Sequence, residues 1–222
     1  MENKIVNNRR FSNGAYIILS IIAMLVVIQF LLIGIKHCIF LFVDRTDFSD
    51  NMATMFGMVV LSGLFILFAK KQKTTLSVFP RIFNKYYIIG TCIAVFILVI
   101  TPSNYSGGFQ AIILLLYGSV ITPVFEELIF RGYVWNKLNT IFRKECCTYI
   151  VTTVLFGVWH LGYFDSIAFR VELLGHTEFA KIMLMKVVIG MVFGVVFGAL
   201  RLKTKNSYST ILLHGVMNIF GK

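Results

Sequence analysis

The sequence predicts an all-α fold, a polytopic transmembrane bundle of about seven helices that forms a single membrane domain over residues 1–222. Three observations lead to this prediction. Hydrophobic residues make up 58% of the chain, where a soluble domain has roughly 45 to 50% even with glycine included. Charged residues make up only 14% and gather in short clusters. The apolar stretches between those clusters approach the ~20 residues that cross a bilayer as a helix.

Each predicted span is an apolar run bounded by polar or charged residues. The first run follows a basic start and is longer than the apolar part of a signal peptide, so we expect it to remain as a span. No connecting segment is long enough to fold as a soluble domain. In order, the predicted spans are 15–35, 52–69, 86–102, 109–130, 147–164, 182–200 and 207–220.

The connecting segments alternate in charge. Segments 44–50 and 165–178 are acidic, whereas the N-terminus and segments 70–85, 131–144 and 201–205 are basic. Positive residues favour the cytoplasmic side, so we expect a cytoplasmic N-terminus and an outside C-terminus in the cell membrane of a bacterium. Topology thus explains the net charge of +11. We therefore expect the lipid bilayer as a partner, and no nucleic acid.

The fourth predicted span has the strongest chemical signal, because Glu126, Glu127 and Arg131 lie in or beside an apolar run. Ionisable groups inside a membrane are costly and usually mark function. At about 100° per residue, Glu127 and Arg131 share a helix face, whereas Glu126 points about 140° away from Arg131. Glu126 is therefore the candidate general base. A structural alternative is that Glu127 and Arg131 lock helices together while Glu126 meets water.

Two backbone features accompany these side chains. Pro123 lacks an N–H and frees a carbonyl near Ser119, so we expect the helix to bend and to open polar backbone to a water pocket beside Glu126. The sixth span has a glycine at every fourth position, which predicts a smooth stripe for close helix packing. These glycines are Gly190, Gly194 and Gly198.

Two later spans contribute histidines. In the fifth span Phe156 and His160 share a helix face, and in the last span His214 and Asn218 do the same. Asn218 cannot titrate, which suits hydrogen bonding to an oxyanion. A single interior histidine is more typical of a hydrogen-bonded link between helices. Together with the glutamates, however, these groups are the set that amide hydrolysis requires.

The CAAX protease and bacteriocin-processing family, also called CPBP or Abi, has motifs that this chain resembles. The resemblance covers roughly residues 109–220, and the first three spans match only in being hydrophobic. The matching motifs, in order along successive membrane helices, are Glu126-Glu127-x-x-x-Arg131, Phe156-x-x-x-His160 and His214-x-x-x-Asn218.

The resemblance implies an intramembrane endopeptidase, a hydrolase related to the type II CAAX prenyl endopeptidases of eukaryotes. It implies as substrate a membrane-associated peptide or a lipidated protein, such as a bacteriocin or pheromone precursor, with a possible part in self-immunity. The implied roles are water activation by Glu126 and His160, oxyanion stabilisation by His214 and Asn218, and support from Glu127 and Arg131.

The resemblance leaves the role of metal open. The family is often labelled metalloprotease, and Glu126, His160 and His214 could bind zinc or another divalent metal with water as the fourth ligand. Equally, a carboxylate and an imidazole could activate water unaided. Because the chain lacks the compact His-Glu-x-x-His of a standard zinc peptidase, we favour a mechanism that requires no cofactor.

Two other functions compete with a peptidase. The chain could be a non-catalytic membrane protein, such as a bacteriocin immunity protein or a scaffold for a sensor, that keeps the family fold without its chemistry. It could also be a small transporter, since buried carboxylates and histidines occur in proton relays. No inverted repeat or pair of broken helices supports the transporter.

Overall fold

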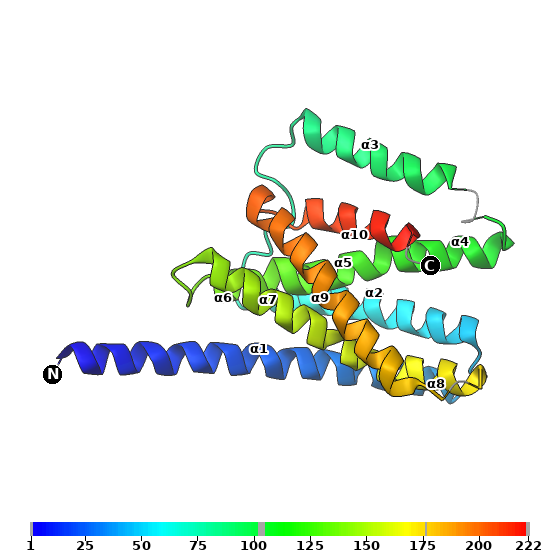
Figure 1. Ribbon diagram of the computed structural model, residues 1–222, viewed down its shortest axis with the longest axis horizontal. Coiled ribbons are helices and arrows are strands. Elements are labelled where there is room, and N and C mark those ends of the chain that lie inside the picture. The colour runs from blue at the N-terminus through cyan, green and yellow to red at the C-terminus, as the bar shows by residue number, and fades with distance from the viewer. Residues whose placement is uncertain (1, 102–104, 176, 221–222) are drawn as a thin grey trace.

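The computed structural model describes residues 2–101, 105–175 and 177–220, and these residues form helices and loops without any strand (Figure 1). The predicted all-α helical bundle is thereby confirmed. The helices are α1 (Glu2–Phe40), α2 (Asp47–Lys71), α3 (Lys85–Ile100), α4 (Gly108–Leu116), α5 (Thr122–Glu127), α6 (Trp135–Leu138), α7 (Glu145–Trp159), α8 (Phe164–Leu173), α9 (Phe179–Thr204) and α10 (Tyr208–Phe220).

The predicted spans correspond to helices in the predicted order, but they are not all of full length. Five helical stretches are long and apolar enough to cross a membrane, and α3 and α10 are apolar but shorter, with 16 and 13 residues. Such composition makes the chain an integral membrane protein. The five long stretches are Gly14–Phe40, Asp47–Lys71, Gly108–Leu138, Glu145–Leu173 and Phe179–Thr204.

The surface of the bundle is apolar, as expected for contact with lipid. Phe30 and Leu31 on α1, Leu64 and Leu67 on α2, and Val188 on α9 are all exposed. Large contiguous apolar surfaces are rare on soluble monomers and mark contact with a partner or a membrane. The hydrocarbon phase of the bilayer therefore covers these faces.

Helix α9 crosses α7 at close range, and the glycine stripe makes this approach possible (Figure 1). A Cβ atom at Gly190 would meet the His160 ring, and one at Gly194 would meet Thr153. The third glycine, Gly198, lies against the Tyr149 ring in the same way. The predicted role of the stripe in close packing is thereby confirmed.

The helix that carries the two glutamates is irregular. A π-helical turn, Tyr117–Ile121, joins α4 to α5, and a second one, Leu128–Val134, joins α5 to α6. The residues on both sides of Pro123 keep helical angles, so the expected bend takes the form of a wide turn rather than a break. Turns of this kind often occur at functional sites.

A group of four charged residues, here called the Asp50 cluster, joins the first two helices to α8. It consists of Lys36, Arg45, Asp50 and Asp165. The Lys36 ammonium lies 2.9 Å from Asp50 and 2.8 Å from Asp165, and the Arg45 guanidinium lies 2.8 Å from each. Asp50 is completely buried and Lys36 is 3% exposed. The sequence predicted loops at 44–50 and from 165 onward, so the buried pairing was not foreseen.

Candidate active site

The candidate active site, here called the Glu126 site, lies where α5, α7 and α10 meet. Its centre is formed by Glu126, Glu127, Arg131 and His214, each of which is at most 3% exposed. The first three come from the irregular helix that carries the glutamates, and His214 comes from α10. The structure thus brings together two of the three sequence motifs directly.

Glu127 has a charged partner on its own helix. Its Oε1 atom lies 2.9 Å from Nη1 of Arg131, in the i,i+4 arrangement expected from helix geometry. The guanidinium also donates to the Gly194 carbonyl at 3.4 Å and lies 4.2 Å from the centre of the Phe156 ring. A buried ion pair of this kind is held by several partners and fixes Glu127 in place.

His214 is oriented by Glu127. Nδ1 of the imidazole lies 3.2 Å from Oε1 of Glu127. Since a carboxylate can only accept a hydrogen bond, Nδ1 is the donor, which leaves Nε2 on the other side of the ring. Nε2 faces Oε2 of Glu126 at 3.8 Å. The Phe197 ring stacks on the imidazole with 4.6 Å between ring centres, which holds its plane.

Glu126 has a different environment from Glu127. Among the described residues, no lysine or arginine lies within ion-pair distance of its carboxylate. Instead, Oε1 accepts hydrogen bonds from the Tyr163 hydroxyl at 2.5 Å and from Nε1 of Trp159 at 3.3 Å. Neutral donors therefore occupy one carboxylate oxygen, while the other oxygen points to His214.

Tyr163 and Trp159 were missed by the sequence analysis. They lie four residues apart on either side of His160, so their spacing places them on one helix face. Because α7 passes into a tight 3₁₀ turn at His160–Tyr163, the Tyr163 side chain also reaches Glu126. The pattern Trp159-His160-x-x-Tyr163 was visible, but two aromatic residues in a membrane span are ordinarily taken as packing.

His160 does not contact Glu126 or His214 through any hydrogen bond or ion pair in the described part of the chain. Its Nδ1 atom donates to the Phe156 carbonyl at 2.8 Å, and its ring lies 5.8 Å from the Tyr163 ring between centres. Tyr163 in turn donates to Glu126. His160 is thus linked to the Glu126 carboxylate through the Tyr163 side chain.

Asn218 lies on the same helix as His214, and its amide is already engaged. Nδ2 donates to the Gly118 carbonyl at 2.8 Å, within the π-helical turn that precedes α5. The amide group carries two N–H donors, so one of them is not used by this bond. This contact ties α10 to the irregular segment of the helix that carries the glutamates.

The residues do not fit the metal set that the family label suggested. A zinc site of Glu126, His160 and His214 needs three ligand atoms within about 2.0–2.2 Å of one point. Glu126 and His214 face each other at 3.8 Å, whereas no hydrogen bond or ion pair joins His160 to either of them among the described residues. Within the described ranges, no three histidine, cysteine, aspartate or glutamate side chains are grouped so that they could hold a metal ion.

Comparison with known proteins gives one match. The family model "Type II CAAX prenyl endopeptidase Rce1-like" matches residues 108–220, just over half of the chain. This range contains the whole Glu126 site, whereas α1, α2 and α3 lie outside it. No curated protein and no solved structure shows significant similarity to the chain. The resemblance inferred from the three motifs is thereby confirmed, and the chain belongs to the Rce1-like family of type II CAAX prenyl endopeptidases.

Proposed function

We propose that the chain is an intramembrane endopeptidase in which Glu126 activates the water that cleaves a membrane-associated peptide or lipidated protein. One observation carries this proposal. Glu126 is buried without a cationic partner, has one oxygen fixed by Tyr163 and Trp159, and turns the other oxygen toward His214. A buried carboxylate without a direct cationic partner is costly inside a membrane and is typical of a functional site.

In the proposed reaction, water sits between Oε2 of Glu126 and Nε2 of His214. The gap of 3.8 Å between these atoms is too long for a direct hydrogen bond and suits a bridging molecule. Glu126 takes one proton from the water while the water oxygen attacks the peptide carbonyl carbon. The proton then passes to the leaving nitrogen as the C–N bond breaks, so that an acid and an amine are formed.

Other side chains support this step. Glu127 and Arg131 keep His214 oriented through Nδ1, and the unused N–H of Asn218 is the proposed donor to the oxyanion. His160 is proposed to assist Glu126 through Tyr163 rather than by direct contact. The base and the donors come from this chain, and we propose that no cofactor is required.

We also propose the orientation that the charge pattern predicts. The α6–α7 loop has Arg143 and Lys144 exposed, whereas Asp44 and Asp47 are exposed beside the Asp50 cluster. Retention of positive residues in the cytoplasm would place the α6–α7 loop inside and the Asp50 cluster outside. Cysteine accessibility at Arg143→Cys and Asp44→Cys in intact cells tests this, in a background where the four exposed native cysteines are replaced by serine. Labelling from outside is then expected only at position 44.

The peptidase proposal is tested by comparing membrane and secreted peptides from cells that express the wild type or Glu126→Gln at equal abundance. The expected result is that a set of cleavage products disappears and their precursors accumulate in the variant. Glu178→Gln, which changes an exposed carboxylate just before the first residue of α9, is the matched control and should leave products unchanged. Identical peptide sets with a preserved wild-type phenotype would instead establish a non-catalytic immunity or scaffold protein.

A further inference from the structure

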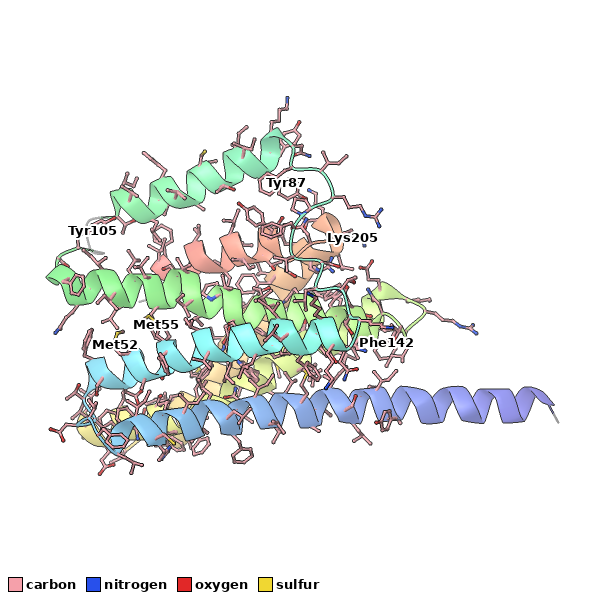
Figure 2. The ribbon with its side chains drawn as sticks, turned by 180° about the vertical axis from the view of Figure 1, so that it is seen from behind. Met52, Met55, Tyr87, Tyr105, Phe142 and Lys205 are labelled. Carbon is pink, nitrogen blue, oxygen red and sulfur yellow. The ribbon has the colours of Figure 1, made fainter. Side chains whose placement is uncertain are left out.

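A groove of about 560 Å³ runs between α3 and α10 and ends at the C-terminal turn of α9. In both views α3 lies at the edge of the bundle, with α10 between it and the other helices (Figures 1 and 2). No residue of α3 is buried. The groove leaves room for something other than protein along the inner face of α3.

The groove has a polar end and an apolar end. The first turns of α3 and α10 lie together, since Asn206 donates to the Tyr87 hydroxyl at 2.9 Å and the hydroxyls of Thr91 and Tyr208 lie 2.6 Å apart. The walls at this end include Asn84, Tyr86 and Ser209. Further along both helices the walls are apolar, with Ile93, Ile97, Leu212 and Val216.

The polar end carries unpaired positive charge. Lys203 lines the groove, and Lys85 begins α3 with its ammonium 5.5 Å from the centre of the Tyr86 ring. Neither lysine has an acidic partner among the described residues. The neighbouring Lys205, labelled with Tyr87 in Figure 2, is the one that pairs, with Glu145. Tyrosine and lysine at the end of an apolar helix are typical of the membrane–water interface.

We propose that this groove binds a membrane phospholipid with an anionic headgroup. The headgroup lies at Lys203 and Lys85, and an acyl chain lies along Ile93 and Ile97. The apolar walls favour a lipid over free phosphate, and the two unpaired ammonium groups favour an anionic headgroup over a zwitterionic one. The lipid fills the space between α3 and α10 and so attaches α3 to the bundle.

Gly90 offers a direct test, because it lines the groove and a Cβ atom there would meet nothing within 4 Å. Leucine at this position fills the groove without straining the backbone. Gly63→Leu on α2 is the matched control, since that glycine is equally open and lies outside the groove. The full chain is placed in nanodiscs of phosphatidylcholine and phosphatidylglycerol, and retained lipid is measured by native mass spectrometry.

The wild type and Gly63→Leu are expected to retain phosphatidylglycerol, and Gly90→Leu to lose it. Reversing Lys203 and Lys85 to glutamate should lower the preference for phosphatidylglycerol by at least about 30-fold, since the loss of two lysines alone removes about 2 kcal/mol. Reversing the exposed Arg143 and Lys144 should leave it unchanged. Equal retention of both lipids by the wild type, or retention by Gly90→Leu, would overturn the proposal. The measurement involves no cleavage, so it succeeds or fails independently of the proposed peptidase activity.

Discussion

Two buried polar groups lie in the same apolar bundle, and they differ in how their charges are balanced. In the Asp50 cluster, two cations face two carboxylates and each carboxylate contacts both cations at 2.8–2.9 Å. In the Glu126 site, Arg131 pairs with Glu127, and Glu126 has two neutral donors and a histidine instead. Balanced charges make a clamp between helices, whereas an unbalanced carboxylate is kept at a cost in stability.

This difference distinguishes the Asp50 cluster, which stabilises the fold, from the Glu126 site, which we propose to be catalytic. Removing one member of a balanced buried cluster leaves an unpaired charge and destabilises the fold. Removing the charge of Glu126 leaves no cation without a partner, so the free energy of unfolding should change little. The proposed base, however, is lost. Four variants, taken from the largest expected effect to the smallest, test this contrast.

Glu126→Gln should lower kcat for peptide cleavage by about 10²- to 10⁴-fold, the usual contribution of a general base. The midpoint of thermal unfolding should stay the same or rise, because a buried carboxylate without a cation is removed. Cleavage is measured in proteoliposomes and unfolding by intrinsic fluorescence. An inactive variant that is also strongly destabilised would break the contrast between the two regions.

Asp50→Asn should have the opposite signature. Lys36 and Arg45 would lose a shared carboxylate, and breaking a buried ion pair costs about 3–5 kcal/mol of stability. The fraction that remains folded should keep the kcat of the wild type. Unfolding in detergent by urea measures the first effect, and active-site-normalised cleavage measures the second. A large fall in kcat per folded molecule would assign the cluster to the reaction.

Tyr163→Phe removes one of the two donors to Oε1 of Glu126. A hydrogen bond to a charged group is worth about 1.5–3 kcal/mol, so kcat should fall about 10- to 100-fold with KM unchanged. Tyr86→Phe is the control, because that tyrosine is exposed on α3, away from the Glu126 carboxylate. A change in KM alone would show that Tyr163 contacts the substrate rather than positioning Glu126.

Arg170→Gln tests the rim of the Asp50 cluster. Arg170 and Asp47 are 37% and 56% exposed, so their ion pair at 2.7 Å should contribute at most about 1 kcal/mol, and the contact of Arg170 with the buried Asp50 is longer, at 3.8 Å. Urea unfolding at low and high salt measures this contribution to stability. The small difference between the variant and the wild type should vanish at high salt. A loss as large as that of Asp50→Asn would show that the rim and the buried centre act as one unit.

The sequence was sufficient for the helices, and it singled out most of the side chains that we propose to take part in the reaction. Charged residues such as Glu126 stand out inside apolar runs, and the i,i+4 spacing of Glu127 and Arg131 gave their pairing. Spacing along one helix does not reveal which faces of different helices meet. For that reason spacing alone does not predict that His214 faces Glu126 directly while His160 contacts Tyr163 instead.

The ends of the spans were harder to predict for a related reason. The fifth span was ended at residue 164 because Asp165 follows it, and the second was begun at 52 because Asp50 precedes it. Both aspartates lie inside helices, because Lys36 and Arg45 neutralise them. A charge marks the end of a span only when it has no partner, and partners distant in sequence cannot be read from one segment.

The π-helical turns on either side of α5 have a consequence for insertions and deletions. Such a turn holds one residue more than an α-helical turn. Deleting one residue between Tyr117 and Ile121 would make the backbone a more regular helix, yet it would rotate α4 by about 100° relative to the glutamates. The bond from Asn218 to the Gly118 carbonyl could then not form. The length of this segment, and not only its composition, sets the alignment between Glu126 and α10.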